Sequence, residues 1–220
     1  MSDHNKLFDT PKDAKATLVL AHGSGQAMNS AFMNEMAARI CADTNYPVEV
    51  VRFNFPYMIL ASESGRHRPP DRAPVLLSAW REVIDSVRPR AHRLFIGGKS
   101  LGGRVATMLA DDAGIIENVD GVVCLGYPFH PPKKPEKLRT THLKTLQTPT
   151  LIVQGERDPF GNREEVANYS LSRNIRFEWM TDGEHGFKPR KSSGTTLEDN
   201  LDAAAAAIIR FMADINQATN

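Results

Sequence analysis

The sequence predicts an α/β fold, a doubly wound and mainly parallel sheet flanked by helices. Short apolar runs rich in β-branched residues alternate along the chain with stretches whose apolar residues recur at helical spacing. This alternation is typical of parallel sheets, because their strands are joined by helical crossovers. The 220 residues, 41% of them hydrophobic, suffice for one domain with a full core. We therefore expect a single domain over 1–220, in which 1–15 form a polar N-terminal extension.

The first predicted strand is the run ATLVLAHG at 16–23, which is rich in apolar residues and is stopped by glycine. Ser30 can cap a following helix, whose apolar stripe consists of Met33, Met36, Ala37 and Ile40. The run VEVVRFNF at 48–55 predicts a second strand, which Pro56 ends.

The middle of the chain repeats the same alternation. The stretch 71–87 predicts a helix through the apolar residues Leu76, Trp80, Val83, Ile84 and Val87. The run RLFIGG at 93–98 predicts a strand that leads directly into the helical segment LGGRVATMLADD. The run GVVCLG at 121–126 predicts the next strand.

The last third of the chain predicts two more strands and a long closing helix. The strands are PTLIVQG at 149–155 and IRFEWM at 175–180, with the helical segment REEVANYSLS between them. Thr195 and Glu198 have the spacing of a capping box at the start of the closing helix. Its apolar face is formed by Leu197, Leu201, Ala204, Ile208, Met212 and Ile215.

Charge and composition argue against several classes of partner. The formal net charge is +1 and the charges are interspersed, so we expect neither nucleic acid nor an anionic membrane as a partner. The first residues lack the apolar region of a signal peptide, and the longest apolar run, 203–209, is too short to span a bilayer. We therefore expect a soluble cytoplasmic protein. Because no Cys or His residues have the spacing of metal ligands, we expect no metal and no cofactor.

The segment FIGGKSLGGR at 95–104 fits two different motifs. Gly98, Lys99 and Ser100 match the end of a phosphate-binding P-loop, but that motif needs a glycine at 93, where this chain has arginine. The same residues match G-x-S-x-G, the motif of a nucleophile elbow, in which a serine lies on a sharp turn between a strand and a helix. Since a strand is predicted before the serine and a helix after it, the elbow is the favoured interpretation.

A nucleophilic serine needs a base to accept its proton and an acid to orient that base. The candidate base is His185, which follows the last predicted strand in a loop that Gly183 and Gly186 would let bend back. The candidate acid is Asp158, because it follows the strand at 149–155 and would face the same crevice. Asp158 also has an interpretation as a turn residue ahead of proline. The weaker candidates for the acid are Glu156, Asp182 and Glu184.

Two backbone N–H groups are candidates for an oxyanion hole. Leu101 is the first residue of the helix after the nucleophile, so its N–H would point toward a developing oxyanion. In the run AHGSGQ, the glycines that flank Ser24 would let its N–H turn toward the same place, with Gly25 as the alternative donor. His22 is expected to brace this loop through local hydrogen bonds.

The motifs HGSG, GKSLGG, GERDPFG and DGEHGF occur in this order, and through them the chain resembles the α/β-hydrolase superfamily from about residue 16 to its end. The segments HGSGQAMNSAFM, RFNFPY and YPFHPPKKPEKLR are similar to the small dienelactone-hydrolase-like branch that includes the KANL-type and testis-expressed hydrolase-like proteins. The resemblance implies an α/β-hydrolase fold with a minimal lid and a triad in the order Ser100, Asp158, His185. Dienelactone hydrolases carry cysteine as nucleophile, so their lactone substrate is not implied.

These observations predict a serine hydrolase, in the simplest case a carboxylesterase, that cleaves ester-like bonds of small substrates, carboxylesters or thioesters, through an acyl-enzyme. The alternative is a catalytically idle hydrolase-like interaction module, since some members of the similar branch look like scaffold domains. The basic segment 133–139 has two interpretations, either a contact with acidic substrates or a solvated surface. The natural substrate and the oligomeric state are not predicted.

Overall fold

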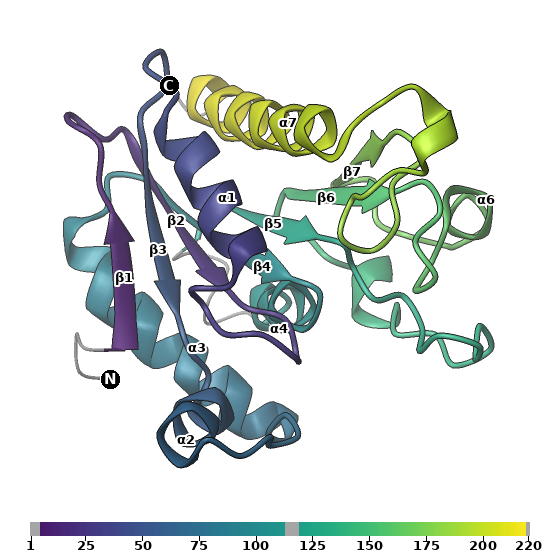
Figure 1. Ribbon diagram of the computed structural model, residues 1–220. Coiled ribbons are helices and arrows are strands. Elements are labelled where there is room, and N and C mark those ends of the chain that lie inside the picture. The colour runs from purple at the N-terminus through teal and green to yellow at the C-terminus, as the bar shows by residue number, and fades with distance from the viewer. Residues whose placement is uncertain (1–4, 113–118, 219–220) are drawn as a thin grey trace.

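A computed structural model describes residues 5–112 and 119–218 of the protein (Figure 1). These residues form a seven-stranded sheet in the order β1-β3-β2-β4-β5-β6-β7, in which β1 is antiparallel to β3 and the other neighbours are parallel. The strands are β1 (Lys6–Asp9), β2 (Ala16–Ala21), β3 (Val48–Phe53), β4 (Leu94–Lys99), β5 (Gly121–Leu125), β6 (Thr150–Gly155) and β7 (Ile175–Met180). The helices are α1 (Ala31–Cys41), α2 (Pro56–Ser64), α3 (Ala73–Val87), α4 (Leu101–Ala110), α6 (Arg163–Val166) and α7 (Leu197–Ala218). The predicted doubly wound, mainly parallel fold is confirmed.

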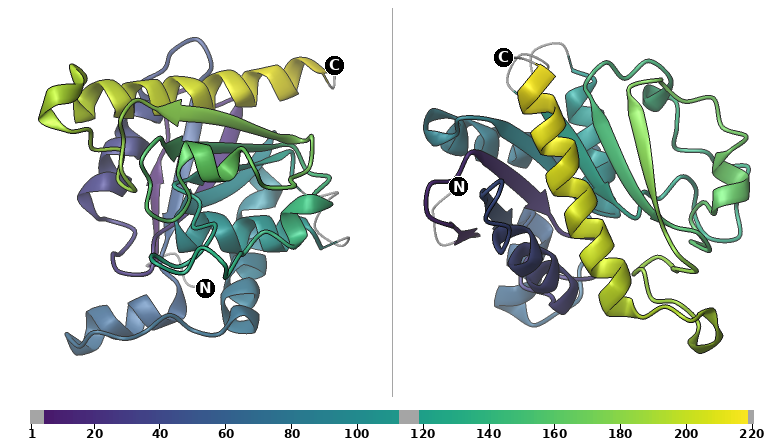
Figure 2. Two further views of the ribbon diagram at one scale, coloured as in Figure 1. Left: turned by 90° about the vertical axis from the view of Figure 1, so that its right-hand side faces the viewer. Right: turned by 90° about the horizontal axis from the view of Figure 1, so that it is seen from above.

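Helices cover both faces of the sheet and divide the core into two layers. Apolar residues of α1 and α7 pack on one face, and those of α3 and α4 pack on the other. Figure 2 shows α7, in yellow, lying across the sheet on the face opposite to α3 and α4. Because both faces of the central strands are covered, every residue of β2 and β3 is buried, and neither strand shows the alternation of a half-exposed sheet.

Local sequence patterns located most of these elements correctly. Helix α1 follows Ser30, and its four buried residues are the four of the predicted stripe. The five apolar residues predicted for α3 are all buried as well. None of the helices in the described ranges is long and apolar enough to cross a membrane.

The start of α7 differs from the prediction by one residue. The N–H of Asp199 donates to Thr196 Oγ1 at 3.1 Å, and the N–H of Thr196 donates to Asp199 Oδ2 at 2.9 Å. The capping pair is therefore Thr196 and Asp199 instead of Thr195 and Glu198. Glu198 instead forms an ion pair with Arg39 of α1.

Three elements depart from the predicted pattern. Strand β1 lies within the predicted polar extension and is held at the edge of the sheet by an ion pair of 2.8 Å between Arg52 and Asp9. Helix α2 begins at Pro56, because a proline that cannot continue a strand fits the first turn of a helix. Helix α6 ends at Val166, and beyond it Tyr169 and Leu171 pack on the core without helical structure.

Candidate active site

Ser100 lies on a strained turn between β4 and α4. Its backbone angles are φ 50° and ψ −108°, which residues other than glycine rarely adopt. Such a conformation costs about 1–3 kcal/mol and persists only where the surroundings enforce it. Here the N–H of Ser100 donates to Leu125 O and the N–H of Arg104 donates to Ser100 O, each at 3.0 Å. The structure thus has the sharp strand-to-helix turn that the G-x-S-x-G motif predicted.

The two glycines of the motif allow the turn to lie against strand β2. A Cβ atom on Gly98 would lie 2.1 Å from Ala21 O, and one on Gly102 would lie 2.3 Å from the same oxygen. Both distances are far shorter than a van der Waals contact. A side chain at either position would therefore push β2 away from β4 or from α4.

His185 forms a hydrogen bond with Asp158. The ring Nδ1–H donates to Asp158 Oδ2 at 2.8 Å, and Asp158 is fully buried. The other oxygen, Oδ1, accepts the N–H of Phe160 at 2.9 Å, while Gln154 Nε2 donates to Oδ2 at 3.0 Å. Because the carboxylate only accepts in these contacts, Nδ1 carries the ring proton, and Nε2 of the neutral ring keeps its lone pair.

The loop that carries His185 is held from several sides. Lys99, the last residue of β4, donates from Nζ to His185 O, and the ring of Phe160 lies 4.3 Å from the imidazole ring between centroids. The positive φ angles of this loop belong to Asp182 (48°) and Phe187 (70°), and not to Gly183 or Gly186, the glycines predicted to let it bend back.

A glycine is nevertheless needed beside this loop, at the end of β6. A Cβ on Gly155 would lie 2.4 Å from Glu184 O and 2.5 Å from Gly183 O. The close approach of the two loops that carry Asp158 and His185 therefore depends on Gly155.

His22 braces the loop after β2, as predicted. Its Nδ1–H donates to Gly23 O at 2.6 Å, and its Nε2 accepts the N–H of Phe55 at 3.1 Å. Burial lowers the pKa of His22 from 6.5 to about 4, so the ring is neutral near pH 7. The hydroxyl of Tyr57 donates to Ser24 O at 3.2 Å, which fixes the next peptide of the loop.

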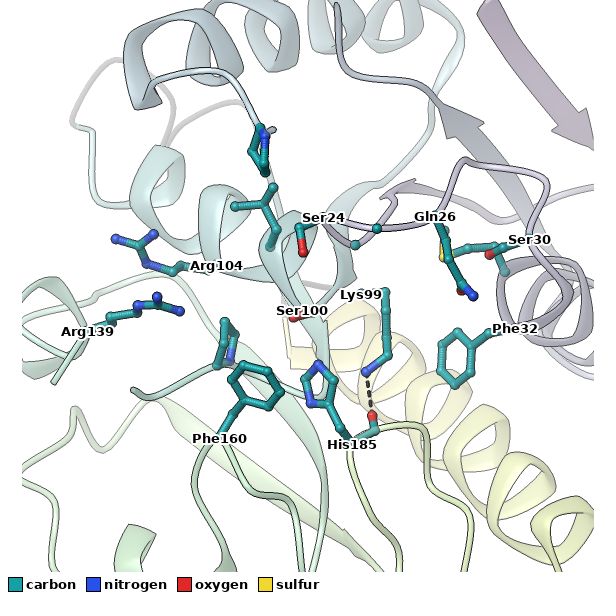
Figure 3. Close-up of a pocket in the computed structure, with 16 residues that line it drawn as sticks. Ser24, Gln26, Ser30, Phe32, Lys99, Ser100, Arg104, Arg139, Phe160 and His185 are labelled. Carbon is teal, nitrogen blue, oxygen red and sulfur yellow. Dashed lines mark hydrogen bonds between the residues drawn. The ribbon is translucent and has the colours of Figure 1, made fainter. Parts of the chain in front are cut away.

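These loops surround a pocket of about 420 Å³, which is shown in Figure 3. Ser100 and His185 both line it, together with Ser24, Gly25 and Leu101, the three residues predicted to supply the oxyanion donors. Asp158 lies behind His185 and is not part of the lining. Among the described residues, no hydrogen bond joins Ser100 Oγ to His185.

The predicted backbone donors at the pocket come from two elements, helix α4 and the loop after β2. Leu101 is the first residue of α4, so its N–H has no acceptor within the helix. In the described part of the chain, the N–H groups of Ser24 and Gly25 make no hydrogen bond either. The pocket therefore has free donors beside Ser100 on two sides, and both predicted alternatives for the second donor remain in place.

Sequence reasoning missed several residues at this site. Gln154 is a polar residue inside a buried strand, which is a signal of a hydrogen-bonding role that was available in the sequence. Arg104 lies one helical turn after Ser100, which the helical period also makes foreseeable. Phe32 reaches the pocket from a distant segment, so no local pattern identifies it. Arg139 belongs to the basic segment 133–139, for which contact with substrate was one of two interpretations, and it lines the pocket. No group of three or more His, Cys, Asp or Glu residues in the described ranges is arranged to hold a metal ion.

Comparison with known proteins identifies the type of domain. A family sequence profile described as "Alpha/beta hydrolase domain" matches residues 14–213. A serine hydrolase homologue from Coxiella burnetii is similar in fold, with a TM-score of 0.68, 19% identity and coverage of 93% of this chain and 89% of that one. Est1E from Butyrivibrio proteoclasticus has a TM-score of 0.69 and 13% identity, with 97% of each chain covered. A dienelactone hydrolase from Anabaena variabilis has a TM-score of 0.69 and 21% identity, with 95% and 90% covered.

Proposed function

The chain belongs to the α/β-hydrolase domain family, and we propose that it is a serine hydrolase that cleaves carboxylester or thioester bonds of small substrates. In this proposal Ser100 is the nucleophile, His185 is the general base and Asp158 orients the base. The N–H groups of Leu101 and of Ser24 or Gly25 form the oxyanion hole. A carboxylesterase is the simplest form of this activity.

The observation that carries the proposal is the convergence of two independent arrangements in one pocket. The strained turn presents Ser100 to the pocket, and the hydrogen bond of 2.8 Å from His185 to Asp158 leaves Nε2 as the free ring nitrogen. A serine with a φ of 50° that lines the same pocket as an oriented imidazole has no evident structural purpose. The serine hydrolase homologue among the similar folds agrees with this chemistry.

The reaction would proceed in two steps. His185 Nε2 accepts the proton of Ser100 as Oγ attacks the carbonyl carbon, and the backbone N–H groups hold the oxyanion of the tetrahedral intermediate. The imidazolium, stabilised by Asp158, then gives its proton to the leaving alcohol or thiol. A water molecule, activated by the same base, attacks the acyl-enzyme and releases the acid together with free Ser100.

The experiment is a comparison of wild type with Ser100→Ala. Wild type is expected to hydrolyse p-nitrophenyl esters and to be labelled by a fluorophosphonate, and the variant should do neither, because only the hydroxyl is removed. Ser78→Ala, at an exposed position on α3, is the matched control and should behave as wild type.

Two outcomes would contradict the proposal. Undiminished labelling of Ser100→Ala would show that another residue is the nucleophile. A correctly folded wild type that neither turns over any ester or thioester nor reacts with the fluorophosphonate would favour the catalytically idle interaction module.

A further inference from the structure

Two arginines lie together in the pocket beside Ser100. Arg104 comes from α4, one turn after the elbow, and Arg139 comes from the segment between β5 and β6, where its N–H donates to Phe129 O at 2.7 Å. Figure 3 shows both guanidinium groups on one side of Ser100, with Gln26, Ser30 and Phe32 on the other. The two arginines therefore form one end of the pocket, and the candidate nucleophile lies between them and the residues of the other end.

Neither arginine has a carboxylate partner among the described residues. Several arginines elsewhere in the protein form ion pairs with aspartate or glutamate, such as Arg39, Arg52 and Arg190. In the described ranges Arg104 and Arg139 take part in no such pair. The Nε atom of Arg104 is buried and has no hydrogen-bond partner among the described residues. A buried N–H of a charged group without an acceptor is costly, and the same residue lines the pocket.

The lining of the pocket does not offset the charge of the two arginines. Burial and the nearby charge of Arg104 lower the pKa of Arg139, so the two cations repel each other. Burial also lowers the pKa of His142, which favours the neutral imidazole, and the hydroxyl of Tyr127 donates to Arg139 O at 2.9 Å. None of the residues that line the pocket is an aspartate or glutamate. Lys99, the third cation of the lining, is already bonded to His185 O.

We propose that Arg104 and Arg139 bind an anionic oxygen group of the substrate, so that the natural substrate is an ester that carries a carboxylate or a phosphate. This proposal rests on the proposed function, because it names the substrate class for the same pocket. Guanidinium groups suit this role, since their planar N–H donors match the oxygens of carboxylate and phosphate in pairs. A pocket of about 420 Å³ accommodates a small molecule that reaches from the arginines to Ser100.

The same geometry answers the question that the basic segment 133–139 raised in the sequence. Arg139 lines the pocket, whereas Lys133, Lys134 and Lys137 are exposed and do not line it. We therefore assign substrate contact to Arg139 and a solvated surface to the three lysines. These lysines also provide controls of the same charge from the same segment.

The test compares pairs of substrates that differ only in charge. One pair is the p-nitrophenyl monoester of adipic acid and its neutral methyl ester, which place the charge on the acyl side. The other pair is p-acetoxybenzoate and its methyl ester, which place it on the alcohol side. Wild type is expected to prefer the charged member of at least one pair by about tenfold or more in kcat/KM.

The variants are Arg104→Gln, Arg139→Gln and Arg139→Lys. Each glutamine variant should lower the charged-to-neutral ratio of kcat/KM by about tenfold, and the lysine variant should retain part of the preference. The ratio is measured on one sample, so the fraction of folded enzyme cancels from it. Lys137→Gln is the matched control and should keep the wild-type ratio. Equal rates within both pairs in wild type, or unchanged ratios in both glutamine variants, would overturn the proposal.

A binding measurement separates this proposal from the catalytic one. Ser100→Ala is titrated by calorimetry with monomethyl adipate, with phenyl phosphate and, as the neutral control, with dimethyl adipate. The anion site is supported if Ser100→Ala binds either charged ligand and if adding Arg139→Gln weakens that binding about tenfold. Equal affinities of Ser100→Ala for all three ligands would overturn it.

The two failures are then distinguishable. Arginine-dependent binding of a charged ligand, in a protein that neither hydrolyses esters nor reacts with a fluorophosphonate, would contradict the proposed function alone. Hydrolysis of neutral esters through Ser100 without any preference for charge would contradict the anion site alone.

Discussion

The Nδ1 atom of His185 lies 2.8 Å from Oδ2 of Asp158, although 27 positions separate the two residues in the chain. They stand on loops that follow the neighbouring parallel strands β6 and β7. The N–H of Arg157 donates to Gly183 O at 2.9 Å and so joins the two loops directly. The orientation of the imidazole is thus set by two loops that are fixed to each other.

Asp158→Asn is expected to keep the fold and to lower kcat by about 10⁴-fold, by analogy with serine proteases. An amide at this position can donate to Nδ1, which would then carry no proton, and the tautomer with the proton on Nε2 cannot accept the proton of Ser100. The measurement is kcat for a p-nitrophenyl ester, with circular dichroism to verify folding.

The controls for this variant are Asp182→Asn and Glu184→Gln. Their carboxylates are engaged elsewhere, since Asp182 pairs with Arg190 and Glu184 Oε1 accepts the N–H of Gly186 at 2.7 Å. Both variants should cost little in kcat. If either lost as much as expected for Asp158→Asn while Asp158→Asn kept most of its rate, the assignment of the acid would be wrong.

Gln154→Met tests the support of Asp158. Gln154 Nε2 donates to Asp158 Oδ2 at 3.0 Å, and its Oε1 accepts the N–H of Tyr127 at 2.7 Å. Methionine is similar in size but leaves the buried N–H of Tyr127 without an acceptor, so we expect a loss of about 1–3 kcal/mol in the free energy of unfolding. The carboxylate also becomes free to move, which should lower kcat by less than Asp158→Asn does. Urea unfolding and kcat are measured together, and a variant unchanged in both would contradict this role.

Gly102→Ala tests the close packing of the elbow. A Cβ at this position would lie 2.3 Å from Ala21 O and 2.7 Å from Ala21 C, and these backbone atoms can move only with the strand. We expect destabilisation by about 3 kcal/mol or more, or loss of soluble folded protein. At Gly25 a Cβ would meet nothing within 4 Å, so Gly25→Ala should leave the unfolding midpoint nearly unchanged. Equal midpoints for the two variants would contradict the steric argument.

The buried ring of His22 is expected to make the folded protein less stable in acid. Burial lowers its pKa from 6.5 in the unfolded chain to about 4 in the folded protein, so between these values the unfolded state binds a proton that the folded state excludes. The contribution of His22 to the free energy of unfolding is complete above pH 6.5 and falls as the pH decreases toward 4, by at most about 3 kcal/mol.

The measurement for this prediction is urea unfolding of wild type and His22→Gln at a series of pH values. Glutamine does not titrate, and its side-chain oxygen can accept the N–H of Phe55 in place of Nε2. The stability advantage of wild type should therefore shrink as the pH falls. Parallel curves for the two proteins would show that His22 is not the titrating group.

Much of the fold could be predicted from the sequence because it depends on local patterns. Strands β2 to β6 are runs rich in apolar residues that are buried along almost their whole length, and the stripe of α1 is set by the helical period alone. Strand β1 could not be found in this way, because Lys6–Asp9 is a strand only where the edge of β3 accepts it. The cap of α7 also lies one residue later than the local pattern predicted, and Glu198 contacts Arg39 of another helix.

The sequence by itself located the elbow at Ser100, because a strand, a G-x-S-x-G turn and a helix follow one another directly in the chain. Which acid contacts His185, and whether Arg139 reaches the same pocket, was decided only by the tertiary structure. Those contacts join loops from different strands, and their distances depend on strand order and on close approaches such as that at Gly155. The spacing of residues along the chain does not contain this information, because side chains far apart in the sequence meet only where the packed sheet brings the ends of its strands together.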